Sequence, residues 1–64
     1  MKKYMVIANF ASNENNNLEI IDFDLSLEQA KEVYKNTINF YKQEGYEYEL
    51  ENICICEHGN FIYN

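Results

Sequence analysis

One segment of this chain, residues 26–44, has the apolar spacing of a single amphipathic helix. Ser26 followed by Gln29 is a capping box, in which each side chain bonds the backbone N–H of the other residue. Gly45 suits the left-handed position just past a helix end. Apolar, aromatic and threonine side chains recur every three or four residues and share one side of this helix: Leu27, Ala30, Val33, Tyr34, Thr37, Ile38 and Tyr41. With 64 residues in all, the chain has room for little more than a small sheet beneath this helix.

Two segments before the helix are predicted to be β-strands. Residues 3–10 and 18–23 are rich in apolar and aromatic residues, and the Asn-rich segment 11–17 between them is typical of a loop. The two strands are therefore expected to form an antiparallel hairpin with a long connection.

The segment after the helix predicts two more strands. Residues 46–57 alternate between polar and apolar, and the apolar set changes face at Glu51 and Asn52, as a β-bulge would produce. His58 and Gly59 suit a tight turn into a last strand over 60–63. The expected fold is one α+β domain over residues 1–64, with a single helix on a small, mostly antiparallel sheet in the order β-β-α-β-β.

The charge of the chain narrows its possible partners. Eleven acidic residues face five lysines and no arginine, which gives a net charge of −6. Direct binding of DNA or RNA is not expected, because phosphate contacts need cationic side chains and base recognition relies heavily on arginine. A negative field instead favours basic protein surfaces, including those of proteins that handle nucleic acid.

An alternating acidic segment is the candidate surface for such a partner. Glu47, Glu49 and Glu51 would stand on one face of an extended strand about 6–7 Å apart, a spacing that can imitate a phosphate backbone. Asp22 and Asp24 would extend this acidic face. The alternative is a solvated edge strand whose charges prevent aggregation.

A second candidate surface is apolar. Both strands before the helix carry apolar side chains on both faces, whereas one helix covers only one face of a sheet. Met5, Ile7, Ile21 and Phe23 are therefore expected to form a face for self-association, most simply in a homodimer. Alternatively, the twist of the sheet and the long loop cover these side chains.

Cys54, Cys56 and His58 form a C-x-C-x-H string and are weak metal-binding candidates. Three donors with Glu57 do not match a standard zinc spacing, and strand-borne thiols often serve as small core residues. No metal or cofactor is therefore expected. Along one strand the two cysteines are too far apart for a comfortable disulfide, and reduced thiols predict a cytoplasmic protein.

The chain offers no pattern typical of catalysis or of membrane insertion. His58 is the only histidine, Ser12 and Ser26 are the only serines, and the two glycines cannot make a phosphate-binding loop. No apolar run approaches the roughly 18 residues that span a bilayer. The chain is therefore not expected to be an enzyme or a membrane protein.

The profile of the whole chain, which is small, acidic, free of arginine and rich in asparagine, resembles the small orphan proteins of phages and other mobile elements. Many of those are stoichiometric inhibitors of bacterial defence proteins, anti-CRISPR proteins among them. The resemblance implies an inhibitor of a basic, nucleic-acid-handling protein and transfers no residue roles. The alternatives are a homo-oligomeric structural or regulatory module and a thiolate metal-binding protein.

Overall fold

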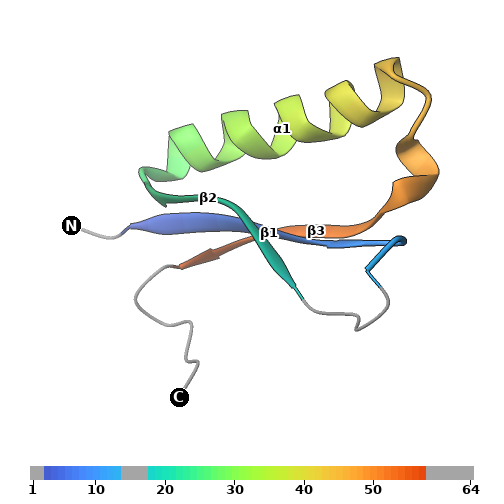
Figure 1. Ribbon diagram of the computed structural model, residues 1–64. Coiled ribbons are helices and arrows are strands. Elements are labelled where there is room, and N and C mark those ends of the chain that lie inside the picture. The colour runs from blue at the N-terminus through green and yellow to red at the C-terminus, as the bar shows by residue number, and fades with distance from the viewer. Residues whose placement is uncertain (1–2, 14–17, 58–64) are drawn as a thin grey trace.

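The computed structural model describes residues 3–13 and 18–57, which form three strands and one α-helix (Figure 1). The elements are β1 (Tyr4–Phe10), β2 (Glu19–Leu25), α1 (Leu27–Gln43), a short 3-10 helix η1 (Glu47–Glu49) and β3 (Leu50–Glu57). The predicted α+β class is confirmed. The described order is β-β-α-β rather than β-β-α-β-β, because the predicted strand over 60–63 lies outside the described residues.

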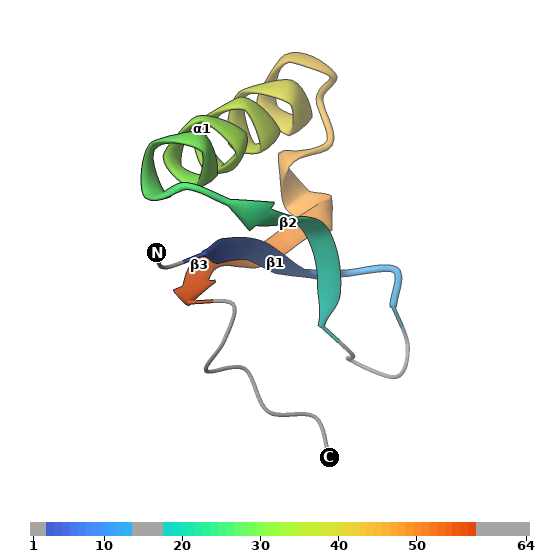
Figure 2. The same cartoon turned by 90° about the vertical axis from the view of Figure 1, so that its left-hand side faces the viewer.

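The three strands form one antiparallel sheet in the order β2-β1-β3. The first strand of the chain is therefore central, with a neighbour on each side. The helix lies along one face of this sheet, which is visible in both Figure 1 and Figure 2.

The helix begins and ends where its local sequence predicts. The Ser26 hydroxyl accepts a 3.1 Å hydrogen bond from the Gln29 N–H, and the Gln29 side chain accepts a 2.9 Å bond from the Ser26 N–H. Gly45 has a φ of 79°, so it takes the left-handed conformation that glycine adopts without steric cost. The capping box and the terminating glycine are thus confirmed.

The core is centred on β1. Four consecutive residues of that strand, Met5 to Ala8, are buried, and Ala30 of α1 is buried above them. The expectation that Met5 and Ile7 lie on an exposed second face is wrong, since they are only 1% and 3% exposed. The physical reason is that β1 is the central strand, so its side chains have cross-strand neighbours on the same face. Cys56 lies opposite Met5, and Ile20 and Cys54 lie opposite Ile7.

The predicted bulge near Glu51 is confirmed. Asn9 pairs with Asn52, and Phe10 pairs with Leu50, so Glu51 is the extra residue on β3. The predicted extended conformation of residues 46–49 is wrong, because this segment forms η1 instead.

Backbone hydrogen bonds explain the turn at η1. The Tyr46 N–H donates to the Tyr41 carbonyl at 2.8 Å, and the Glu49 N–H donates to the Tyr46 carbonyl at 2.9 Å. These bonds fix the turn that connects the end of α1 to β3. Within the described part of the chain, no helix is long and apolar enough to cross a membrane.

Candidate functional site

The candidate site is a groove between α1 and the edge strand β2. Pairing of β2 with β1 shifts register twice, once between Tyr4 and Val6 and again between Val6 and Ile7. Asp24, within the first irregular stretch, has a φ of 60°, which few residues other than glycine adopt. Bulges of this kind bend an edge strand and increase its twist. Figures 1 and 2 show β2 bending across β1, so that the end of β2 that leads into α1 lies beside the helix and its other end lies away from it.

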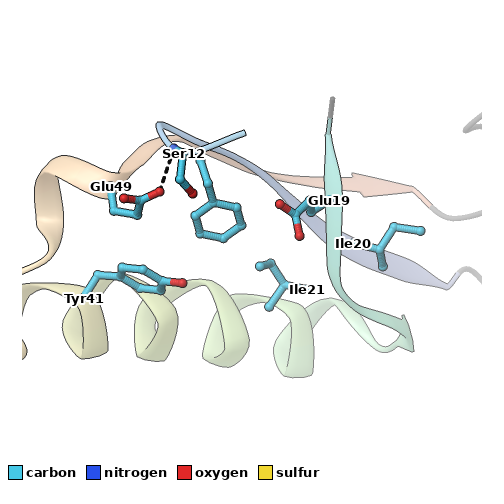
Figure 3. Close-up of a pocket in the computed structure, with 7 residues that line it drawn as sticks. Ser12, Glu19, Ile20, Ile21, Tyr41 and Glu49 are labelled. Carbon is cyan, nitrogen blue, oxygen red and sulfur yellow. Dashed lines mark hydrogen bonds between the residues drawn. The ribbon is translucent and has the colours of Figure 1, made fainter. Parts of the chain in front are cut away.

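One end of the groove is a hollow of about 470 Å3 whose walls are partly polar and partly apolar (Figure 3). This end is called the polar end, because it carries the carboxylates of the groove. Carboxylates enter it from two sides, Glu19 from β2 and Glu49 from η1, while the Tyr41 hydroxyl is directed into it from α1. Its lining comes from β1 and the turn after it, from β2, from α1 and from η1: Phe10, Ser12, Glu19, Ile20, Ile21, Tyr41 and Glu49.

The other end is an adjoining hollow of about 490 Å3 with a mainly apolar lining. It shares Ile21 and Tyr41 with the first hollow, so the two hollows adjoin at these side chains. Its lining belongs to α1 apart from Ile21: Ile21, Val33, Asn36, Thr37, Phe40 and Tyr41.

Aromatic contacts hold the shared wall of the groove. The Tyr41 ring lies 5.6 Å from the Phe10 ring and also 5.6 Å from the Phe40 ring, the latter in a T-shaped arrangement. Phe40 is itself 58% exposed, so its side chain is accessible to a ligand. The two hollows together, from Glu19 and Glu49 to Phe40, are called the α1–β2 groove below.

Glu49 is fixed at the polar end of the groove. Its carboxylate accepts a 2.7 Å hydrogen bond from the Ser12 N–H, and its own carbonyl accepts a 2.7 Å bond from the Ala11 N–H. Hydrogen bonding by Ser12, from its side chain and then from its backbone N–H, lowers the pKa of Glu49 below the ordinary value. Glu49 is therefore a carboxylate at neutral pH.

The polar end has the composition of a site for a cation. The Asn13 side-chain amide lies 3.5 Å from the Glu19 carboxylate. Among the described residues that line the two hollows there is no lysine. Two carboxylates and a tyrosine ring offer a lysine or arginine side chain charge pairing and a π face.

The structure separates the five acidic residues predicted to form one face. Glu47 and Glu49 lie in η1, whereas Glu51 is the bulged residue of β3, so the three do not alternate along one extended strand. The Asp22 carboxylate accepts a 2.9 Å bond from the Phe23 N–H, and Asp24 lies 3.8 Å from the Lys3 ammonium. Of the five, only Glu49 lines the groove. Their role as a partner-binding face stays a prediction.

The four residues predicted for self-association are also separated. Met5 and Ile7 are buried, and Ile21 is half-buried in the groove. Phe23 alone is exposed.

The two cysteines are free thiols on β3, with their sulfur atoms 3.8 Å apart. Burial is the main cause that raises the pKa of Cys56, and the neighbouring Cys54 raises it further. His58 lies outside the described residues. Within the described ranges, no three His, Cys, Asp or Glu side chains gather as a metal site.

Sequence reasoning missed Glu19, Phe40 and Tyr41 as site residues. Tyr41 was assigned to the buried face of the helix, and it does contact Phe10 there while its hydroxyl reaches the groove. Phe40 carried a usable signal, because it is a large aromatic residue beside, rather than within, the apolar stripe of α1. No protein-family model, no curated protein and no solved structure matches this chain.

Proposed function

We propose that this chain is a small acidic binding protein that occupies a basic surface of a partner protein through its α1–β2 groove. The observation that carries the proposal is the pairing of an anionic hollow, bordered by Glu19 and Glu49, with an adjoining apolar hollow at Phe40. A partner segment that fits both has a lysine or arginine next to an aliphatic or aromatic residue.

The distribution of charge supports this choice of partner. Helix α1 holds three lysines and two glutamates and so has a net charge of +1. Since the whole chain has a net charge of −6, the residues outside α1 have a net charge of −7. The excess of negative charge therefore lies outside the helix, and among these acidic residues Glu19 and Glu49 line the groove. Such a field steers basic surfaces toward the groove and raises their association rate.

Inhibition follows from occupancy in this proposal. A basic nucleic-acid-handling protein presents lysine and arginine side chains to phosphates, and a bound acidic domain covers these side chains stoichiometrically. The chain needs no catalytic residues for this role, and we propose that it is not an enzyme.

A defined peptide tests the groove directly. The probe is a short fluorescent peptide of alternating arginine and leucine, and its control replaces each arginine with uncharged citrulline. We expect the arginine peptide alone to bind, with an affinity that falls as salt concentration rises. Binding is measured by fluorescence anisotropy, and NMR chemical-shift changes should concentrate at Glu19, Ile21, Phe40 and Tyr41.

Matched variants separate the groove from overall charge. Glu19→Lys should weaken peptide binding about 2- to 30-fold, because an attraction of about 0.2–1 kcal/mol becomes a repulsion of similar size. Glu32→Lys makes the same change in net charge on the exposed side of α1 and should have a much smaller effect. Equal losses in the two variants would show that net charge, and not the groove, determines binding.

The apolar end needs its own control. Phe40→Ala should weaken the peptide further, since the adjoining hollow loses its exposed aromatic wall. Tyr48→Ala removes an aromatic side chain that is 69% exposed and lines neither hollow, and it should leave affinity unchanged. The natural partner can then be sought with wild type, Glu19→Lys and Glu32→Lys as parallel baits.

Self-association through β2 is a second candidate function. Ile20 and Phe23 of this edge strand are 51% and 57% exposed, and Leu18 just before it is also exposed. A second copy that covers these side chains would bury an apolar strip along an edge strand of the described sheet. Sedimentation equilibrium should then show a dimer for wild type and a monomer for Phe23→Asp. A wild-type monomer at high concentration would remove this candidate.

A further inference from the structure

Three sulfur atoms come from adjoining positions on the sheet face opposite α1. Phe10 contacts Tyr41 of the helix, so the alternate residues of β1, Met5 among them, belong to the opposite face. Cys56 of β3 pairs directly with Met5, and Cys54 pairs with Ile7. Directly paired residues of antiparallel strands share a face, with their Cβ atoms about 4.5–5.5 Å apart. Met5, Cys54 and Cys56 therefore lie together on this face.

The two thiols already have the separation that a shared metal ion requires. Their sulfur atoms are 3.8 Å apart. Two sulfurs, each about 2.3 Å from one ion and separated by a tetrahedral to trigonal angle, lie about 3.8–4.0 Å from each other. Cys54 is exposed and Cys56 is half-buried, so an ion can reach them from solvent.

The thioether of Met5 is the third sulfur near the two thiols. Its side chain is 1% exposed and unbranched, and a methionine side chain has three rotatable bonds that let its thioether adapt to a neighbour. We propose that Cys54, Cys56 and Met5 form a three-sulfur site for a soft monovalent cation, Cu(I). This inference concerns the opposite side of the sheet from the α1–β2 groove and is independent of the function proposed there.

The donor set decides between metal ions. Thiolate and thioether sulfurs select Cu(I), which is stable with three sulfur ligands. Zn(II) in structural sites takes four ligands from thiolate, imidazole and carboxylate groups, and a thioether is not among them. Binding of Cu(I) displaces the two thiol protons to the buffer and leaves the metal in the same oxidation state.

Competition with a coloured Cu(I) chelator tests the site on the full chain, reduced and kept free of oxygen. Wild type should withdraw one Cu(I) per chain from bathocuproine disulfonate. Cys54→Ser and Cys56→Ser should each weaken binding by more than about 100-fold. Loss of a direct ligand should exceed the roughly 10- to 100-fold loss of affinity that follows when a residue that only positions a ligand is replaced. Met5→Leu, which conserves volume, should weaken it about 10- to 100-fold.

Circular dichroism of each variant establishes that it is folded before its affinity is compared. Zn(II) serves as the matched ion and should bind wild type and Met5→Leu equally and weakly. A wild-type affinity no higher than that of the Cys54→Ser/Cys56→Ser double variant would overturn the site. So would one Cu(I) per two chains with no effect of Met5→Leu, since this result indicates a four-thiolate site shared between copies.

Discussion

The two outer strands of the sheet, β2 and β3, flank the same central strand and yet differ in regularity. β3 pairs with β1 over seven positions with one register shift, at Glu51. β2 pairs with β1 at four positions and shifts twice. The regular strand places Ile53 and Ile55 opposite the buried Ala8 and Val6, and so supports the core. The irregular strand bends over β1 and leaves the groove beside α1.

This difference separates the part of the domain that forms the core from the part that we propose for binding. A core needs continuous pairing and close packing, which β1 and β3 provide beneath the helix. A recess large enough for a ligand needs a strand that departs from the sheet, and two bulges in β2 achieve this without a second helix. The described residues therefore form hollows of about 470 and 490 Å3 although the chain has only 64 residues.

The largest expected effect contrasts two isoleucines that pair with each other across β1 and β2. Ile7→Ala removes a side chain that is 3% exposed and should lower the free energy of unfolding by about 2–5 kcal/mol. Ile20→Ala, its exposed partner on β2, should change that free energy by no more than about 0.5 kcal/mol. Urea unfolding followed by far-ultraviolet circular dichroism measures both, with Ile7→Val as a milder step of about 0.5–1.5 kcal/mol. Similar losses from both alanine variants would mean that β2 contributes to the core as much as β1.

A smaller effect compares two residues whose φ is positive, Gly45 just after α1 and Asp24 near the end of β2. Gly45→Ala should cost about 1–2 kcal/mol, and the cost arises from backbone conformation alone because nothing lies within 4 Å of the added Cβ. Asp24→Ala in β2 should cost less, since Asp24 already carries a Cβ at a φ of 60°. Thermal unfolding of the two variants gives the comparison. A larger loss for Asp24→Ala would show that side-chain contacts, such as that with Lys3, hold the bend of β2.

The smallest expected effect is a pH dependence at the junction of η1 with β3. Folding lowers the pKa of Glu49, so its carboxylate stabilises the native state above the ordinary value of 4.5, and this stabilisation is lost as pH falls through the lowered pKa. Glu49→Gln should therefore be less stable than wild type at neutral pH and equal to it in strong acid. Urea midpoints at a series of pH values measure the difference, with Glu47→Gln as the control for removing one charge from η1. A difference that does not change with pH would assign the loss to geometry rather than to charge.

Local chemistry made the helix the most predictable element. The Ser26 and Gln29 capping box, the apolar stripe and Gly45 each act within a few residues, and the predicted range 26–44 matches α1 with its two caps. The bulge at Glu51 was predictable for a similar reason, because a change in the face of apolar residues is visible along one strand.

The groove could not be predicted to the same degree. Glu49 was recognised as acidic, but its position beside Ser12 and across from Glu19 brings together segments that are far apart in the chain. The alternation of residues 46–49 favours a strand. In the structure this segment forms η1 instead, because its backbone bonds to the end of α1 and to itself where the chain passes from the helix to the sheet. Met5 and Ile7 look like surface residues only until β1 is known to be the central strand.

The sequence by itself determined the α+β class, the limits of the helix, the acidic character and the pair of cysteines on one strand. All of these depend on interactions within a few residues or on composition alone. Only the tertiary structure decided the strand order β2-β1-β3, the burial of Met5 and Ile7, and the meeting of Glu19, Glu49 and Tyr41 in one groove. These features arise from pairing and packing between distant segments. The contacts that stabilise them form only when the whole chain folds.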